Sequence, residues 1–232
     1  MRILALGAHP DDIEIFMFGT MAAYAAQGAE LTFAVATDGA RGGKGDPAAL
    51  ARARREEACG AAALLGATPR FLDFPDGALV ADAEMIATLK ALVGEIGPDL
   101  VITHAPNDYH ADHRALSDGV RIAASFRVPV VHADTMGGTG FSPTHYVDIS
   151  THAAIKAEAI RMHRSQAPEQ YVDRARIQNE FRAGQCNGVA GSLAEAYRFE
   201  PTFPFADIRA LLPPAPPLRP VMPNPSTVVQ AG

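Results

Sequence analysis

The sequence contains no tryptophan and only two cysteines among its 232 residues, so it offers neither a disulfide framework nor a CxxC metal site. Cys59 lies in a helical pattern and Cys186 in a later polar stretch, and we interpret both as ordinary thiols. Basic residues are also few, because 20 Lys and Arg face 26 Asp and Glu and leave a formal net charge of −6. No basic run exceeds "RARR" at 52–55, which argues against nucleic acid and anionic membranes as partners.

Long apolar runs are missing as well. No stretch approaches the ~20 apolar residues that a membrane-spanning helix needs. The beginning of the sequence lacks the small-residue cleavage site of a signal peptide. We therefore expect a cytoplasmic protein that acts on a small soluble substrate and has no membrane partner.

Short runs rich in Val, Ile and Leu alternate with segments of helical period, a pattern typical of a doubly wound α/β fold. Strands are predicted at 2–7, 31–37, 69–74, 99–104 and 128–133, and helices at about 13–27, 47–66, 82–96, 112–125 and 151–164. After residue 165 the pattern loosens into polar and aromatic pieces. We expect one domain over 1–211, followed by a proline-rich, extended or disordered tail over 212–232.

Two clusters of metal-type side chains follow predicted strands. "GAHPDDIE" at 7–14 places His9, Asp11 and Asp12 after the first strand, and "APNDYHADH" at 105–113 follows the fourth. In a sheet ordered 3-2-1-4-5 these two strands are neighbours, and ligands bind beyond their carboxyl ends. The sequence therefore predicts that both clusters face one crevice.

Such a crevice can hold a catalytic zinc ion, which takes three protein ligands and lowers the pKa of a bound water to about 7. His9, Asp12 and His113 can supply the three ligands, and Asp11 is placed to act as the general base. His110 is then free to stabilise an oxyanion or protonate a leaving amine, with Asp112 orienting it or raising its pKa.

Structural explanations compete with these roles. Asp12 alone could be the N-cap of the next helix, and a lone HxxH pair often lies exposed on the surface without forming a site. Nothing structural, however, requires both clusters in two loops of one crevice. Of the remaining histidines, His104 and His145 could support the ligands from behind, and the others are interpreted as structural or solvated: His132, His152 and His163.

Several further motifs extend the pattern along the chain: "AHPDDIE" (8–14), "TDGARGG" (37–43), "RREEA" (54–58), "HADH" (110–113), "FSPTHYVDIS" (141–150), "HRSQ" (163–166) and "AEAYR" (194–198). Together they resemble the LmbE-like, or PIG-L, superfamily of zinc-dependent N-acetylglucosaminyl deacetylases over roughly residues 1–200. Ala111 departs from this resemblance, because the family commonly has proline at that place.

The resemblance implies a Rossmann-like, mostly parallel sheet with helices on both faces. It also implies one zinc ion per chain, with Fe²⁺ and Co²⁺ left open, and hydrolysis of an N-acetyl group from a glucosamine-type sugar. Its pattern gives the same metal ligands, base and oxyanion group as the residues do. Relatives often form trimers or hexamers, which leaves a homo-oligomer open for this chain.

Three residues are candidates for substrate binding. Arg54, which opens "RREEA", matches a position where the family places an arginine against the substrate, although it could equally be a solvated helix charge. Arg41 lies in the glycine-rich loop near the predicted mouth, and Asp38 ends the second strand. An arginine and an acid around the crevice favour a sugar.

Two other functions stay open. The same metal site could act on an amide of a thiol conjugate, or hydrate an unsaturated carboxylic acid. A non-catalytic nucleotide-binding domain would use Asp38 on a ribose, but the first turn lacks GxGxxG and places carboxylates where a pyrophosphate would bind.

Overall fold

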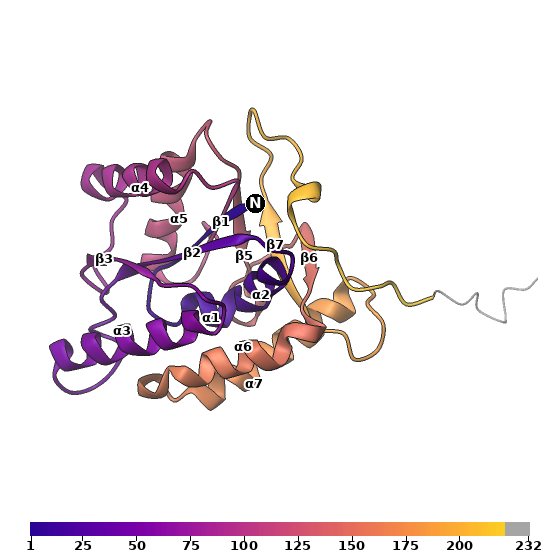
Figure 1. Ribbon diagram of the computed structural model, residues 1–232, viewed down its shortest axis with the longest axis horizontal. Helices are drawn as coiled ribbons and strands as arrows, with labels where there is room; N and C mark the ends of the chain where they lie inside the picture. Colours follow the sequence, from indigo (N-terminus) through magenta and orange to yellow (C-terminus); the bar gives the residue numbers. More distant parts are fainter. Residues whose placement is uncertain (221–232) are drawn as a thin grey trace, which may run out of the picture.

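The computed structural model describes residues 1–220, and residues 221–232, the last part of the predicted tail, lie outside the described residues. The described chain forms one seven-stranded sheet in the order β3-β2-β1-β4-β5-β7-β6 (Figure 1). Its strands are β1 (Arg2–Gly7), β2 (Glu30–Thr37), β3 (Arg70–Phe74), β4 (Leu100–Thr103), β5 (Val130–Ala133), β6 (His145–Asp148) and β7 (Ala194–Phe199). Its α-helices are α1 (Asp12–Phe16), α2 (Phe18–Ala26), α3 (Pro47–Ala63), α4 (Ala83–Ile96), α5 (Ala111–Ala124), α6 (Ala153–Met162) and α7 (Pro168–Gln185).

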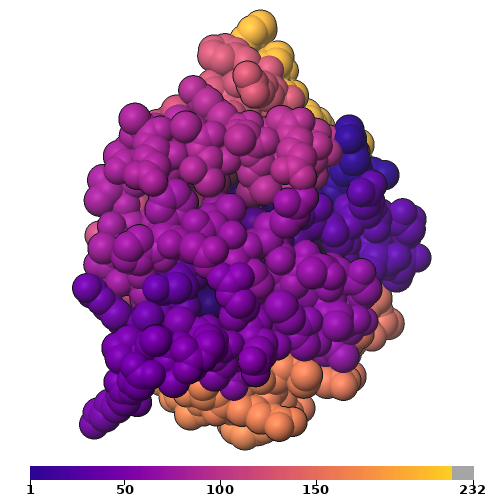
Figure 2. Space-filling model, turned by 60° about the vertical axis from the view of Figure 1, so that its left-hand side comes forward, coloured from indigo at the N-terminus to yellow at the C-terminus, as the bar shows by residue number. Residues whose placement is uncertain are grey.

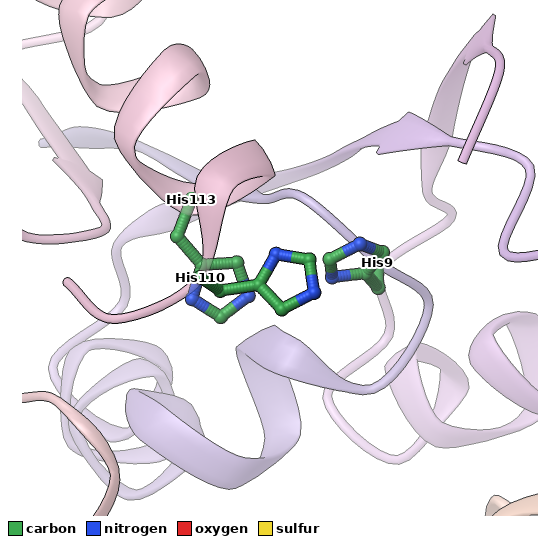
Figure 3. A group of neighbouring side chains, drawn as sticks. All are labelled: His9, His110 and His113. Carbon is green, nitrogen blue, oxygen red and sulfur yellow. The ribbon is translucent and has the colours of Figure 1, made fainter. Parts of the chain in front are cut away.

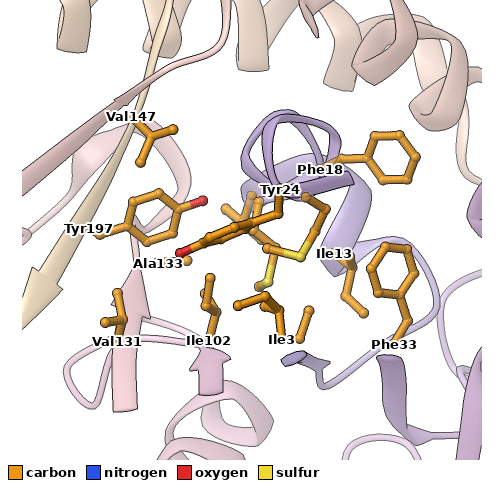
Figure 4. Packing of buried hydrophobic residues seen from close by; sticks show 14 of the residues in the cluster. Ile3, Ile13, Phe18, Tyr24, Phe33, Ile102, Val131, Ala133, Val147 and Tyr197 are labelled. Atoms are coloured by element: carbon orange, nitrogen blue, oxygen red, sulfur yellow. The ribbon is translucent and has the colours of Figure 1, made fainter. Parts of the chain in front are cut away.

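Helices cover both faces of the sheet, as predicted. Successive side chains of a strand point to opposite faces, so β1 divides its apolar residues between two cores. Ile3 and Ala5 pack in the core beneath α2 and α6, and Figure 4 shows Ile3 in this core. Leu4 and Leu6 pack in the second core, beneath α4 and α5, two helices that lie on the other side of the sheet in Figure 1. Because β1 is buried on both sides, the turn that follows it starts from a rigid base.

The predicted order of the first five strands is confirmed. β1 pairs in parallel with β2 on one side and with β4 on the other, and β5 extends the parallel part. The carboxyl ends of β1 and β4 therefore lie side by side at one edge of the sheet. This places the loops that begin at residues 8 and 104 next to each other.

The helix predicted over 13–27 is wrong as a single element, because the chain breaks at Met17 into α1 and α2. The break is stabilised by Glu195 of β7, whose carboxylate accepts the backbone N–H groups of Gly19 and Thr20 at 2.9 and 2.8 Å. Lys156 donates to the same carboxylate at 2.6 Å. A cap from a residue so distant in sequence leaves no local signal.

Strand β6 and the elements after residue 165 were not predicted. α7 packs along α6 (Figure 1), and β6 and β7 add an antiparallel pair to the sheet beside β5. Within the predicted tail, Pro214 and Pro217 accept hydrogen bonds from the backbone of Asp148 and Val189. No helix among the described residues is long and apolar enough to cross a membrane. The domain boundary at residue 211 stays a prediction.

Candidate metal centre and active site

The site begins in the turn between β1 and α1. The carbonyl of His9 accepts the backbone N–H groups of Asp11 and Asp12, and the Asp12 carboxylate accepts the N–H of His9 at 2.7 Å. Gly7 makes this tight turn possible, because a Cβ there would lie 2.9 Å from the Cβ of Asp12. Asp12 therefore does not cap the helix with its side chain; it folds back over the strand end.

The three predicted metal ligands, His9, Asp12 and His113, come together. Figure 3 shows His9 and His113 side by side, with His110 beside them. The Asp12 carboxylate lies 3.3 Å from His9 Nδ1 through one oxygen and 3.3 Å from His113 Nε2 through the other. His113 stands in the first turn of α5, which starts directly after the loop that follows β4. All three residues are at least nine-tenths buried.

The described residues contain three groups of potential metal ligands. Within each group, the ligand atoms all lie within 4.8 Å of one another. The groups are His9, His110 and His113; Asp12, His104 and His113; and His9, Asp76 and Asp112. The predicted ligand set draws on the first two groups, which share His113. Imidazole and carboxylate donors of this kind suit Zn²⁺, Fe²⁺ and Co²⁺.

The residues fit a bound cation. Both ring nitrogens of His113 are buried without a hydrogen-bond partner in the described part of the chain. Burial lowers the pKa of His113, yet Asp12 and Asp108 raise it overall to about 9. Burial also lowers the pKa of His9, but the carboxylates of Asp12, Asp112 and Asp76 outweigh this effect. Together they raise the pKa of His9 to about 12. The carboxylates that hold protons on these rings also attract a metal ion.

Two carboxylates that sequence reasoning missed lie behind the ligands. Asp108 Oδ2 is 3.1 Å from His113 Nδ1, and Asp76 Oδ1 is 3.2 Å from His9 Nε2. Asp108 precedes the predicted cluster in the same loop, and Asp76 follows β3. Their position after strand ends was the available signal.

His110 is the N-cap of α5, and its Nδ1 accepts the backbone N–H of Asp112 at 3.2 Å. The proton of the neutral ring is therefore assigned to Nε2. Burial, with the neighbouring His113 and His9, lowers the pKa of His110, so the ring is neutral near pH 7. The Asp112 carboxylate contacts His9 Nε2 at 3.2 Å instead of the His110 ring.

Asp11 lines the same cavity as His9, His110 and His113. It is paired with Arg54, whose Nη2 lies 3.0 Å from Asp11 Oδ1. Burial raises the pKa of Asp11 to about 6, although Arg54 opposes the rise. Arg54 is 3% exposed and also donates to the carbonyls of Gly39 and Pro10. Arg54 is therefore neither a solvated charge on the helix surface nor a side chain free to move at the mouth of the cavity.

A cavity of about 290 Å³ opens over these residues. Figure 2 looks onto this side, where a small area of indigo from the start of the chain shows inside a hollow. Arg41 and the aromatic residues Tyr109 and Tyr171 line the cavity. Asp38 is not among the lining residues; its Oδ1 accepts the backbone N–H groups of Ala40 and Asp76.

Of the other histidines, His104 lies against the metal centre. Its Nε2 is 3.0 Å from Asp12 Oδ2, and its ring stacks on His113 at 3.7 Å. Burial lowers the pKa of His104 to about 4, so it stays neutral. His163 is buried against Glu14 at 3.3 Å. His145 instead bonds Thr144 at the edge strand β6.

Comparison with known proteins gives relatives with two kinds of activity. Diacetylchitobiose deacetylase of Thermococcus kodakarensis is 29% identical over 189 residues, which are 72% of this chain and 71% of that protein. 4-Oxalmesaconate hydratase of Pseudomonas putida is 32% identical over 119 residues, 47% of this chain and 46% of that protein. The chain thus aligns with less than half of the second relative.

A solved structure agrees with the fold. N,N'-diacetylchitobiose deacetylase from Pyrococcus horikoshii superposes with a TM-score of 0.76 at 25% identity, covering 86% of this chain and 84% of that one. The family described as PIG-L, GlcNAc-PI de-N-acetylase, matches residues 4–124, a segment that contains all the predicted metal ligands and catalytic residues. The chain belongs to the PIG-L family.

Proposed function

We propose that this protein is a metal-dependent deacetylase that removes the N-acetyl group from an N-acetylglucosamine-type sugar or a conjugate of one. The observation that carries the proposal is the convergence of Asp11 and His110 on the cavity above His9, Asp12 and His113. Two deacetylases among the similar proteins support the same reaction.

His9, Asp12 and His113 would hold the ion, for which we propose Zn²⁺, with Fe²⁺ or Co²⁺ as substitutes. When bound, the ion supplies a Lewis acid that polarises the amide carbonyl and makes water more acidic. Asp11 would accept the proton of the attacking water at its carboxylate. Its pKa of about 6 keeps it ionised at pH 7 while leaving it basic enough to take a proton.

His110 would act on the other side of the scissile amide. Because Nδ1 accepts from the backbone, Nε2 carries the hydrogen and can donate it to the developing oxyanion. The lowered pKa keeps the ring neutral, so it acts as a hydrogen-bond donor and not as a cation. When the C–N bond breaks, the leaving nitrogen must gain a proton, and Asp11, protonated by the attacking water, would return that proton to it.

The cavity wall supports a sugar as substrate. Tyr109 is 60% exposed at the mouth and faces the same cavity as Tyr171 and Met136. Such rings pack against the apolar face of a pyranose, while Arg41 and Gln166 across the cavity can bind hydroxyl groups. We propose Tyr109 and Arg41 as substrate contacts. Asp38 would act only by holding the loop that carries Arg41.

Release of primary amine from a panel of N-acetylglucosamine glycosides tests the proposal. The metal-loaded protein should release amine, a chelator should abolish the reaction, and added Zn²⁺ should restore it. Amine release that continues unchanged under complete metal removal would refute the mechanism.

A second candidate is hydration of an unsaturated carboxylic acid, favoured by the similarity to 4-oxalmesaconate hydratase. Arg41 could bind the carboxylate of such a substrate. Loss of ultraviolet absorbance from a conjugated dicarboxylate, without amine release from any glycoside, would favour this activity. An amide of a thiol conjugate belongs in the same substrate panel.

A further inference from the structure

The Asp112 carboxylate has three hydrogen-bond partners, and none of them is the His110 ring. Oδ2 accepts the backbone N–H of Gly77 at 2.7 Å and lies 3.2 Å from His9 Nε2. Oδ1 accepts the N–H of Leu79 at 3.2 Å. With 2% of its surface exposed, Asp112 is closed off from other partners.

This arrangement fixes the tautomer of His9. An imidazole that ligates a metal ion is neutral and carries one proton, and a carboxylate facing Nε2 would keep that proton on Nε2. The lone pair of Nδ1 is then directed to the side of Asp12, 3.3 Å away. Asp76 also lies 3.2 Å from Nε2, but only the Asp112 contact has the alignment of a hydrogen bond.

We infer that Asp112 is a positioning residue for the metal ligand His9, acting through its carboxylate. The hydrogen bond between Asp112 and His110 comes from the backbone N–H of Asp112 and not from its side chain. The inference about Asp112 rests on the proposed function in one respect, because it requires that His9, Asp12 and His113 bind a metal ion. Partners that orient a ligating histidine typically contribute 10–100-fold to metal affinity.

An alternative use of the same atoms must be separated from this one. His9, Asp76 and Asp112 form one of the three compact donor groups and could hold a second ion of their own. However, Asp112 already accepts from the 77–79 loop, and Asp76 accepts the backbone N–H of Arg41 at 2.8 Å. Carboxylates oriented by backbone donors in this way suit a histidine N–H better than a second cation.

The two substitutions Asp112→Ala and Asp112→Asn have different expected effects. Alanine removes the acceptor for His9 and both acceptors for the loop. An asparagine oxygen at the Oδ2 position accepts from both Gly77 and His9, whereas the Oδ1 position has one donor, so the amide should orient with its oxygen toward His9. Asparagine should therefore loosen the loop at Leu79 and still position His9.

The experiment measures Zn²⁺ affinity of the full chain by competition with a chelating dye, and the absorption spectrum of the Co²⁺ form. Asp112→Ala should bind Zn²⁺ about 10–100-fold more weakly, while Asp112→Asn should stay within about threefold of the wild type. Asp118→Asn is the matched control, because this residue lies on the same helix with its side chain 54% exposed. If Asp112→Ala does not fold, as judged by circular dichroism, Asp112→Ser replaces it.

Three results would overturn the inference. The first is wild-type Zn²⁺ affinity in folded Asp112→Ala combined with lost turnover, which would place the carboxylate's action on His110. The second is binding of two ions per wild-type chain, and the third is no Zn²⁺ binding at all, which would also refute the proposed function. The expected affinity pattern without cleavage of any amide would refute only the proposed function.

Discussion

Replacing Arg54 with alanine tests how Asp11, the proposed base, is held in place. The guanidinium lies 3.0 Å from Asp11 Oδ1 and is 3% exposed, so the pair is shielded from solvent. Charges about 4 Å apart interact by about 4 kcal/mol at an effective dielectric constant of about 20. Removing one partner of a buried pair typically costs about 3–5 kcal/mol, because the other charge is left uncompensated.

We therefore expect Arg54→Ala to lower the free energy of unfolding by about 3–5 kcal/mol at pH 7.5. Arg55→Ala is the matched control, since Arg55 is the next residue of α3 but pairs with Asp73 on the surface. Exposed pairs contribute about 0–1 kcal/mol. Urea unfolding followed by circular dichroism, with metal removed from all samples, gives both values.

The penalty should depend on pH in a defined direction. The pKa of Asp11 in the folded state is about 6, which is above the ordinary value of an aspartate. At any pH above that ordinary pKa, the ionisation of Asp11 therefore lowers the free energy of unfolding. Loss of Arg54 removes the group that opposes this rise. The Arg54→Ala penalty should therefore shrink between pH 7.5 and pH 5, where Asp11 takes up a proton. Equal effects of the two alanine substitutions, or a penalty that grows toward acid, would refute the reasoning.

Three further predictions concern the site and its surroundings. Asp11→Asn should keep bound Zn²⁺ but lower kcat by about 100-fold or more, because the amide cannot take the proton; metal analysis beside turnover checks this. Tyr109→Ala should raise KM for a glycoside several-fold with little change in kcat, and Tyr109→Phe should restore KM; an equal effect of both would argue against ring packing. Burial lowers but Glu14 raises the pKa of His163, which ends above its ordinary value. The stabilisation by this pair is thus fully present below pH ~6.5 and is lost as pH rises through the raised pKa. The Tm difference between wild type and His163→Gln should be largest near pH 5.5, and a difference that widens above pH 8 would contradict the assignment.

The sequence was sufficient to predict the parallel part of the sheet and the meeting of two loops. Apolar runs such as that of β1 carry a strong periodic signal, and the strand order follows from general topology. α7 lacked such a signal, because charged residues are spread around its circumference and its apolar residues Ile177 and Phe181 are more than half exposed. At the far side of the sheet, β7 pairs with β5 and with the edge strand β6, and no local sequence pattern encodes these pairings.

At the site, residue type was predictable and orientation was not. Arg54 and Arg55 are adjacent and chemically identical, yet Arg54 is buried under the turn that carries Asp11, and Arg55 pairs with Asp73 on the surface. Gly42 leaves room for the buried guanidinium, because a Cβ at this position would overlap Arg54. In the same way, "HADH" suggests that Asp112 serves His110, whereas its carboxylate reaches across the crevice to His9.

The cap that Glu195 places on α2 bears on how the protein can be assembled during synthesis. Residues 4–124 include every proposed metal ligand, yet the start of α2 is capped by the carboxylate of Glu195, which is synthesised about 70 residues after the end of this segment. Glu195 in turn needs Lys156 and the hydroxyl of Tyr197 as partners inside the apolar core. A nascent chain that stops before β7 would carry all the proposed metal ligands without the carboxylate that caps α2. We therefore expect the site to form only after the C-terminal third of the chain has been synthesised, although none of the proposed ligands lies in that third.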